Sequence, residues 1–392
     1  MEAIQRPVDG FKSLRNCTLK LEEKVTCLVG LNGAGKSTLL QAMSFMSALV
    51  QGRVGEWLTR RHWTEKDLKS RLTSEACSSG NISFAAVIRL SSGSCVRWKA
   101  CFNTSQRCCT LEEVWRQESE SGHCLLRVEG NRLSLYGKDW EEIGHRYEGS
   151  ILSSLTDARL PFEGRQVRGI LSSLRSLDGL HCQEMCGSFR NEAEDAIGAA
   201  GEEIVAYLST RHEDEIKGTL VPPLKQFFPS LVDVRLKKKR CGRAELWIKE
   251  RFGGQTIEVK ALHCSDGLLR LLGIVTALNT SADVLCFDEI GNSISVDVCS
   301  PLVDTLMQSG KQVVITTHNM LLVNLLPPKA IRLIYKTTAA ATQVTDFCEL
   351  PEVRKSLEVF GPGDALLDLS LSKVTEEAIC VNAAEAEVVK KV

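Results

Sequence analysis

The sequence predicts an α/β protein in which a mixed sheet with helices is joined by an antiparallel sheet and an inserted helical lobe. A short apolar run at 25–29 is followed at once by a glycine-rich loop and a helical pattern. Two further apolar runs, at 282–287 and 312–316, end in polar residues, as strands that build a site do. Residues 82–140 read as successive strands separated by turns, which suits an antiparallel sheet.

Length and composition narrow the class of protein. A chain of 392 residues is too long for one simple core, so we expect two packed lobes. The net charge of -1 gives no overall attraction to nucleic acid or anionic membrane, so such binding must rest on local patches. Neither a signal-peptide pattern nor a long apolar stretch is present. We therefore expect a cytoplasmic protein with no membrane partner.

The 16 cysteines are scattered and form no C-x-x-C pair. Cys182 and Cys186 are four positions apart, without a matching second pair. This spacing disfavours structural zinc. Reduced thiols, as in a cytosolic protein, are the better interpretation.

Residues 30–38 match the pattern G-x-x-x-x-G-K-S between a strand and a helix, the setting that this motif requires. The glycines let backbone N–H groups turn around a triphosphate at a helix N-terminus. Lys36 is expected to reach the β- and γ-phosphates, and Ser37 to bind Mg²⁺. No N-K-x-D motif is present, which favours adenine over guanine. The predicted ATP-binding residues are Gly30, Asn32, Gly33, Ala34, Gly35, Lys36, Ser37 and Thr38, with ATP and Mg²⁺ as cofactors.

The apolar run 282–287 predicts a second, distant part of the same site, because it ends in Asp288 and Glu289. At the carboxyl end of a parallel strand beside the phosphate loop, Asp288 would hold Mg²⁺, directly or through water. Glu289 would then orient and deprotonate the attacking water. We therefore predict Asp288 as a metal ligand, with Ser37, and Glu289 as a catalytic residue.

The run 312–316 is followed by Thr317, His318 and Asn319. A histidine at this point can donate a hydrogen bond to the γ-phosphate. Alone, it would more often be a surface or core residue. Its position one strand after an Asp-Glu pair favours the functional interpretation, so His318 is the second predicted catalytic residue.

The segment 263–273, HCSDGLLRLLG, has two interpretations. Ser265 can cap a helix whose leucines recur at the spacing of one buried face. Alternatively, Ser265, Gly267 and the first backbone amides form an anion site at the N-terminus of that helix. In a single monomer such a site would lie far from Lys36. These residues alone favour the two interpretations equally.

The order of the motifs resembles that of ABC-type ATPases: phosphate loop, long insertion, S-x-G before a helix, strand with D-E, short D-loop, then T-T-H. More narrowly, the chain is similar to the soluble branch that contains RecF, the SMC and related DNA-repair ATPases, and the OLD-family defence ATPases. The similarity covers about residues 1–50 and 195–335. It is carried by Phe11-Lys12-Ser13-Leu14 and by the stretches 195–208, 227–239 and 316–334.

The resemblance implies an ABC-type P-loop NTPase head that forms a head-to-tail homodimer, or a higher even oligomer, around ATP. Ser265 and Gly267 of one subunit would contact the γ-phosphate held by Lys36 of the other. The sequence departs from the family pattern in reading C-S-D-G-L at the signature. It also lacks L-H-P in the D-loop, so that only Asn292 is carried over. The Q-loop glutamine has two candidates, Gln106 and Gln117.

The same resemblance suggests the division of the chain. Residues 1–150 would form the N-terminal half of the head with the Walker A motif and the antiparallel sheet. Residues 151–230 would form an inserted helical lobe. Residues 231–345 would form the C-terminal half, with the signature, Walker B motif and switch histidine. Residues 346–392 would be a C-terminal extension.

The most basic run of the chain lies at the turn of a predicted hairpin with strands 231–238 and 244–250. It could contact a nucleic-acid backbone. A solvated hairpin tip that lysines protect against edge pairing is the interpretation we favour. Its cations are Arg235, Lys237, Lys238, Lys239, Arg240 and Arg243, and Arg60-Arg61-His62 is a second, weaker cluster.

Two functions are compatible with these motifs. The leading one is an ATP-hydrolysing ABC-type ATPase that acts on DNA, in repair or in defence against phage and mobile DNA. Residues 350–392 carry no cluster of acidic metal ligands, so any nuclease or toxin is expected on a separate effector protein. The alternative is a nucleotide-gated sensor or scaffold with little turnover that holds or releases such a partner.

Overall fold

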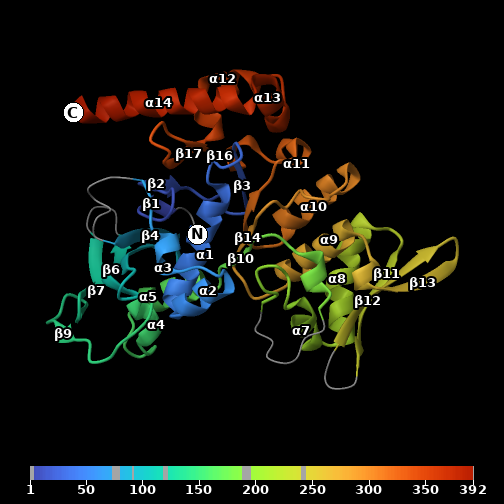
Figure 1. Ribbon diagram of the computed structural model, residues 1–392, viewed down its shortest axis with the longest axis horizontal. Coiled ribbons are helices and arrows are strands. Elements are labelled where there is room, and N and C mark those ends of the chain that lie inside the picture. Colours follow the sequence, from blue (N-terminus) through green and yellow to red (C-terminus); the bar gives the residue numbers. More distant parts are fainter. Residues whose placement is uncertain are drawn as a thin grey trace. The chain divides into compact units, whose positions relative to one another are not determined.

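The computed structural model describes residues 4–72, 80–90, 92–117, 122–187, 196–239 and 244–391 (Figure 1). The chain divides into two compact units. Unit 1 comprises Met1–Leu174, Pro328–Phe360 and Ala365–Val392. Unit 2 comprises Arg175–Pro327 and Gly361–Asp364.

A six-stranded antiparallel sheet forms one side of unit 1. In β5 every second side chain is buried, and these include Trp98 and Phe102, so one face of the sheet lies on the core. The prediction of antiparallel strands over 82–140 is confirmed. In their order across the sheet, the strands are β4 (Asn81–Arg89), β5 (Cys95–Asn103), β6 (Cys108–Gln117), β7 (Gly122–Glu129), β8 (Arg132–Leu135) and β9 (Glu141–Glu142).

A second group of strands in unit 1 contains the phosphate loop. Strand β3 (Val25–Val29) is buried along its whole length, as its apolar sequence predicts. It pairs in parallel with β16 (Ile331–Lys336), which pairs in antiparallel fashion with β17 (Thr342–Asp346). A short antiparallel pair, β1 (Ile4–Val8) and β2 (Cys17–Leu19), precedes them. The mixed sheet of the predicted α/β fold is thus present within this unit.

Helix α1 (Lys36–Gln51) connects the phosphate loop to the core of unit 1. Phe45, near its middle, is completely buried, and its ring centroid lies 5.3 Å from that of Phe102 and 5.0 Å from that of Trp57. Aromatic pairs at this separation contribute about 0.5–1.5 kcal/mol each beyond their buried area. The aromatic packing of Phe45 therefore fixes the position of the helix whose first turn follows the phosphate loop.

The remaining helices of unit 1 cover its sheets. Helix α5 packs on α1 and on strands β5 to β7, and α14 packs on β16 and α12. Helix α14 extends as a long rod to the C-terminus (Figure 1). Their bounds are α2 (Val54–Arg60), α3 (Glu65–Leu68), α4 (Ile151–Ser154), α5 (Phe162–Ser172), η4 (Pro328–Ala330), η5 (Phe347–Glu349), α12 (Pro351–Ser356), α13 (Pro362–Leu369), whose first residues lie in unit 2, and α14 (Leu371–Lys391).

Unit 2 contains three parallel strands. Strand β14 (Val284–Phe287), which precedes Asp288, lies between β10 (Arg175–Leu177) and β15 (Gln312–Thr316). All residues of β14 and β15 are buried. Both strands were expected from their apolar runs, whereas β10 was not. Their carboxyl ends point to the same edge, where polar side chains collect.

Helices and a three-stranded antiparallel sheet complete unit 2. The sheet pairs β11 (Leu231–Lys238) with β12 (Ala244–Phe252), and β12 with β13 (Gln255–Lys260), so the predicted hairpin is confirmed and carries a third strand. Helix α8 packs on β11, α9 and α10. The other elements are α6 (Cys182–Met185), α7 (Ile204–Ser209), α8 (Glu213–Phe227), η3 (Ala261–His263), α9 (Asp266–Leu278), α10 (Val296–Gln308) and α11 (Met320–Asn324).

The segment 151–230, which the sequence suggests as one helical lobe, is divided between the two units. Its helices α4 and α5 belong to unit 1, and α6 to α8 belong to unit 2. Strand β10 lies between these groups and pairs with β14. The chain therefore returns to a sheet between the two groups of helices.

A buried carboxyl group fastens the antiparallel sheet to helix α4. Glu112 of β6 has no exposed surface. It accepts hydrogen bonds from Trp98 Nε1 at 2.7 Å, from the Ile151 backbone N–H at 2.8 Å, and from the Ser150 hydroxyl. Burial raises the pKa of Glu112, and these three donors oppose that shift. Ser150 is in turn the N-cap of α4, so the carboxyl group and the cap form one network.

We expect Glu112→Ala to lower the free energy of unfolding by about 2–4 kcal/mol, because it leaves buried donors without an acceptor. Urea unfolding followed by tryptophan fluorescence measures this, since five of the six tryptophans lie in unit 1. Glu141→Ala is the control: its side chain is 60% exposed and pairs with Arg159, so its effect stays within about 0.5 kcal/mol. Equal losses in the two variants would contradict the structural role of Glu112.

Candidate functional site

The phosphate loop in unit 1 has the backbone that its glycines allow. Gly33 and Gly35 have φ angles of +76° and +112°, in the left-handed region that L-residues rarely adopt. Gly30 packs so closely against the Ile334 carbonyl of β16 that a Cβ atom there would overlap it. The loop therefore requires glycine for its conformation at two positions and for close packing at a third.

Thr342 of β17 holds this loop from behind. Its hydroxyl, completely buried, donates to the Ala34 carbonyl at 2.8 Å and lies 2.8 Å from the Ser13 hydroxyl. A Cβ atom on Gly35 would overlap the Thr342 side chain. Sequence reasoning missed Thr342, because 308 positions separate it from Ala34 and no local pattern marks it.

The loop has the features of a triphosphate site. Gly35 is the N-cap of α1 and supplies no side-chain cap, so the first N–H groups of the helix are not used by a capping side chain. Lys36 is 7% exposed, and its Nζ donates to the carbonyls of Gly30 at 2.8 Å and Leu31 at 3.2 Å. Its charge is thus held inside the loop. Ser37 is exposed in the first turn, where its hydroxyl can serve as a hard oxygen ligand for Mg²⁺.

In unit 2, one hydroxyl group orients both predicted acidic residues. Thr316, the last residue of β15, donates from Oγ1 to Asp288 Oδ1 at 2.6 Å and accepts from the Glu289 N–H at 2.7 Å. Asp288 Oδ2 accepts no hydrogen bond from the described residues, so the carboxylate keeps an oxygen of the kind that Mg²⁺ prefers. Thr316 was missed as a site residue, although its position one strand from an Asp-Glu pair is a usable signal.

Glu289 is held in an uncommon conformation. Its φ angle is +52°, which costs energy for a residue other than glycine. Asn292 Nδ2 donates to Glu289 Oε2, and the Asn292 N–H donates to the Glu289 carbonyl at 3.1 Å. The predicted D-loop asparagine and the predicted base thus lie together. Gly291 between them packs so closely on Thr317 that a larger residue would displace this turn.

His318 follows β15 and is exposed. A hydrogen bond between the residues on either side of His318 fixes the backbone conformation there: Thr317 Oγ1 accepts from the Asn319 N–H at 3.0 Å. The Asn319 side chain caps α11 by accepting from two N–H groups of its first turn. The histidine side chain is therefore presented from a fixed turn at the edge of the parallel strands.

The signature segment forms the capped helix that one interpretation expects. Ser265 Oγ accepts from the Leu268 N–H at 3.4 Å, and α9 runs from Asp266 to Leu278. Ser265 is exposed, and a Cβ atom on Gly267 would come within 2.9 Å of the Ser293 carbonyl. The first turn of α9 therefore lies against the backbone at Ser293 in the same unit, one residue after Asn292. Capping does not exclude the second interpretation, since the helix N-terminus stays exposed.

Neither of the two candidates for the Q-loop glutamine has a contact that assigns it this role. Gln106 lies in the turn between β5 and β6, where its N–H donates to Asn103, and Gln117 ends β6. The Q-loop glutamine thus stays unassigned.

Three of the described cations of the basic hairpin pair with acidic residues of the same three-stranded sheet. Lys237 pairs with Glu258 at 2.6 Å, and Lys239 pairs with Glu245. Arg235 pairs with Asp233. Arg240 and Arg243 lie outside the described residues. In the second cluster, Arg60 pairs with Glu56. These ion pairs favour the solvated interpretation.

Within the described ranges, no three His, Cys, Asp or Glu side chains are placed to bind one metal ion. None of the described helices combines the length and apolar composition needed to span a membrane.

Comparisons with known proteins agree with this arrangement. A family model described as "AAA ATPase domain" matches residues 7–89, which include the phosphate loop. A second model, described as "AAA domain, putative AbiEii toxin, Type IV TA system", matches residues 203–324, which include Ser265, Asp288 and His318. Among the curated proteins that were compared, none matches the chain.

Two solved structures are similar to this chain. An SMC head bound to the C-winged helix domain of ScpA has a TM-score of 0.55 at 14% identity, over 88% of this chain and 98% of that one. The SMC head domain from Thermotoga maritima has a TM-score of 0.48 at 13% identity, over 88% and 99%. The first of these similarities confirms the predicted P-loop NTPase head as the fold. The two family models match separate parts of the chain and describe both as AAA-type ATPase domains, whereas the similarity to the SMC head concerns the fold alone.

Proposed function

We propose that this protein binds ATP and Mg²⁺ on the phosphate loop and hydrolyses ATP, with Glu289 as the general base. The observation that carries the proposal is the shared hydroxyl of Thr316, which holds the Asp288 carboxylate and the Glu289 backbone in one arrangement. A base fixed in this way needs little reorganisation when it takes a proton from water. His318 would donate a hydrogen bond to the γ-phosphate.

The phosphate loop and Asp288 have separate proposed roles in ATP binding. Gly30, Asn32, Gly33, Ala34, Gly35 and Thr38 would bind the phosphates through the loop, and Lys36 would neutralise their charge. Ser37 and Asp288 would hold Mg²⁺, which supplies charge neutralisation at the phosphates when bound.

We further propose that two copies close head to tail around ATP. Ser265 and Gly267 of one subunit would contact the nucleotide held by Lys36 of the other, with Asn292 at the same interface. The exposed N-terminus of α9 supports this, because an uncovered helix N-terminus favours an anion. A higher even oligomer of such dimers fits the same contacts.

The cellular role that we propose is DNA metabolism, or defence against phage and mobile DNA, in the cytoplasm and with a separate effector protein. The match to a model described for a toxin of a Type IV TA system supports the defence role. The SMC head of the same fold is bound to a domain of another protein, which supports a separate partner.

A second candidate function is a nucleotide-gated sensor or scaffold with little turnover. It is favoured by the Asn292 amide, which donates to Glu289 Oε2 and so occupies one oxygen of the proposed base. Steady-state ATP hydrolysis with and without DNA separates the two candidates. A scaffold would show neither basal nor stimulated turnover, whereas an ATPase would show one or both.

Glu289→Gln should lower kcat roughly 10²–10⁴-fold, because an amide cannot accept the proton of the attacking water. ATP binding should persist, so the variant should accumulate as an ATP-bound dimer. Phosphate release measures the first effect and light scattering the second. Asp297→Asn, which changes an exposed carboxylate on α10, is the matched control and should behave as the unmodified protein. A Glu289→Gln protein that stays monomeric in the presence of ATP would contradict the proposed head-to-tail dimer.

Ser265→Arg should leave ATP binding by the monomer unchanged while hydrolysis and dimer closure fail, because the arginine obstructs the contact offered to the partner. Loss of the helix cap alone would cost about 0.5–2 kcal/mol of stability. Ser265→Asp therefore serves as a second variant, since it retains a capping oxygen but repels phosphate. Ser300→Arg, at an exposed position of α10, is the control. Normal turnover in both Ser265 variants would contradict the role in trans.

A further inference from the structure

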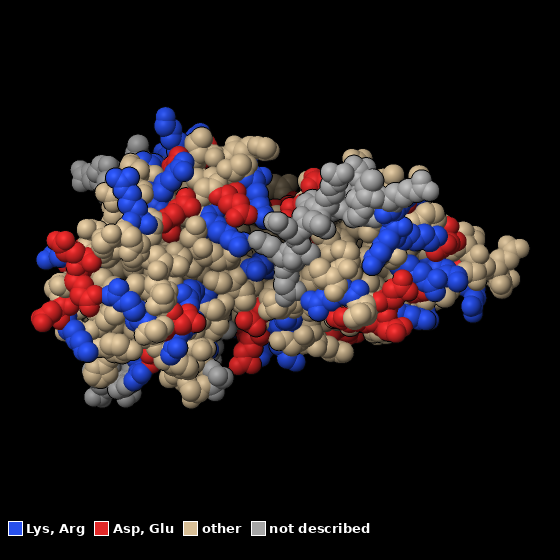
Figure 2. Space-filling model, turned by 90° about the horizontal axis from the view of Figure 1, so that it is seen from below, with Lys and Arg blue, Asp and Glu red and all other residues tan. Residues whose placement is uncertain are grey.

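Helix α9 carries one cation, Arg270, among buried leucines. Leu268, Leu269, Leu271 and Leu272 are at most 3% exposed, and Arg270 itself is half-buried. On the face shown in Figure 2, by contrast, Lys and Arg side chains lie at the surface among Asp and Glu side chains. A guanidinium group among buried leucines loses hydration, which costs free energy unless an acceptor offsets the loss. Arg270 therefore needs an acceptor inside the protein.

The described residues give Arg270 Nε no acceptor. The atom is buried, and no hydrogen-bond partner lies within reach of it in the described part of the chain. An unsatisfied buried donor is destabilising, and such groups are rare in folded proteins. An acceptor that a neighbouring side chain can supply by rotating is the simplest explanation for a donor at this position.

A small cavity in unit 2 shows which acceptors are near. Its volume is about 10 Å³, close to the smallest that holds one water molecule. Arg270, Asp288 and Glu289 contribute to its lining, and the other five lining residues are buried and apolar. Apolar surroundings strengthen the attraction between a guanidinium group and a carboxylate, because they exclude water. The acceptors available to Arg270 are therefore the two acidic residues of the proposed site.

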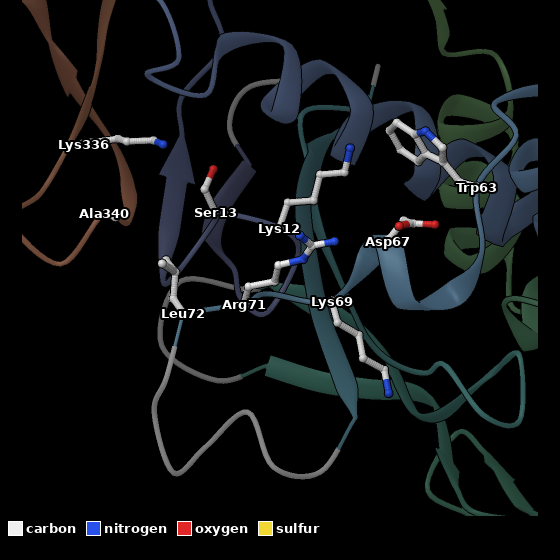
Figure 3. A pocket seen from close by; sticks show the side chains of 9 residues that line it. All are labelled: Lys12, Ser13, Trp63, Asp67, Lys69, Arg71, Leu72, Lys336 and Ala340. Atoms are coloured by element: carbon white, nitrogen blue, oxygen red, sulfur yellow. The ribbon is translucent and has the colours of Figure 1, made fainter.

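The size of this cavity excludes a phosphate group as the partner. A cavity in unit 1 is much larger, at about 420 Å³, and Figure 3 shows the cationic side chains of Lys12 and Lys336 in its lining. That cavity adjoins the phosphate loop, since the Ser13 hydroxyl in its lining lies 2.8 Å from the hydroxyl of Thr342. A volume of about 10 Å³ has room for neither a phosphate nor a nucleotide. Arg270 therefore acts on neighbouring groups of the protein.

Arg270 and Thr316 adjoin the acidic turn from opposite sides. Strand β14, which ends before Asp288, has β15 on one side and β10 on the other. Thr316, at the end of β15, binds Asp288 and the backbone of Glu289 from the first side. On the second side, the cavity that Arg270 lines is also lined by Leu177, the last residue of β10. A hydroxyl group thus holds the turn on one side, and a guanidinium group lies beside it on the other.

Of the two carboxylates, that of Glu289 has an oxygen that Arg270 can use. Asp288 Oδ1 accepts from Thr316, and Asp288 Oδ2 is the oxygen proposed for Mg²⁺. Glu289 Oε2 accepts from Asn292 Nδ2, whereas Oε1 accepts no hydrogen bond from the described residues. A carboxylate has about four acceptor sites, so a second donor still leaves Glu289 able to take a proton from water.

We propose that Arg270 is a positioning residue for the proposed base. Its guanidinium group donates to the Glu289 carboxylate, directly or through the one water molecule that the cavity can hold. Asn292 on one oxygen and Arg270 on the other then fix the plane of the carboxylate from two directions. A base held in this way needs little reorganisation when it takes a proton. The inference rests on the proposed hydrolysis of ATP and adds a residue to it.

The test is steady-state ATP hydrolysis by the full chain at saturating Mg²⁺, with Arg270→Met as the first variant. Methionine fills the apolar surroundings and removes the donor, so the variant should stay folded, with a urea midpoint no lower than that of the unmodified protein. We expect kcat to fall roughly 10–10²-fold, as for a misplaced catalytic group. The KM for ATP should stay unchanged, because Arg270 does not reach the nucleotide.

Two further variants accompany Arg270→Met. Arg270→Lys retains a charged donor and should recover part of the lost kcat. Arg251→Met is the matched control, since it makes the same change at an exposed arginine of β12 in the same unit, and it should behave as the unmodified protein. An unchanged kcat in Arg270→Met would overturn the proposal.

A double variant separates an action through Glu289 from a general structural effect. Losses in kcat from independent sites multiply, whereas losses from residues that act as a unit do not. Adding Arg270→Met to Glu289→Gln should therefore lower kcat by less than about twofold more, measured in single turnovers. Full multiplication of the two losses would contradict the role of Arg270 as a positioning residue.

The same measurements distinguish this inference from the proposed function. If Glu289→Gln abolishes turnover and Arg270→Met leaves it unchanged, the inference alone fails. If Arg270→Met raises the Mg²⁺ concentration that is required and regains full kcat at saturating Mg²⁺, the guanidinium group acts on Asp288, and again the inference alone fails. Full turnover in Glu289→Gln, or none in the unmodified protein, would contradict the proposed function and the inference with it.

Discussion

The conformation of the phosphate loop in unit 1 depends on one buried hydroxyl group, that of Thr342. It donates to the Ala34 carbonyl inside the phosphate loop, contacts the Ser13 hydroxyl, and leaves no room for a side chain at Gly35. A loop built from glycines loses much conformational entropy when it is ordered. The Thr342 contacts supply part of the compensation, and they do so from a strand that is itself paired with β16.

Unit 2 uses the same kind of contact for its acidic residues. The Thr316 hydroxyl joins the ends of two parallel strands by binding Asp288 and the backbone of Glu289. A left-handed φ angle at Glu289 persists only where the surroundings determine it. Thr316 and Asn292 provide these surroundings, and Gly291 allows the turn to pack closely on Thr317. The phosphate loop and the turn at Glu289 are thus each held in one backbone conformation by hydrogen bonds from a threonine hydroxyl group.

The sequence predicts those features whose residues are adjacent in the chain. The strand, glycines and helix of the phosphate loop are contiguous, so their pattern identifies them, and the Ser265 cap depends on a residue three positions away. Thr342 could not be predicted in this way, because its partner is 308 residues distant. Strand β10 was missed because three residues are too few to show the alternation of apolar and polar side chains that marks a strand. The helices of 151–230 lie on either side of this strand in the sequence, and they belong to different units. The ion pairs that neutralise Lys237 and Lys239 depend on strand register, which composition does not reveal.

The position of Thr342 also bears on how the chain can be shortened. A fragment that ends soon after His318 would contain every motif by which the ATP site is recognised in the sequence. It would lack β16, which the phosphate-loop strand β3 pairs with, and the β17 hydroxyl that closes the loop. For this protein, the smallest piece with an intact phosphate loop is therefore set by a strand pairing near residue 346, and motif boundaries are a poor guide to where an expression fragment should end.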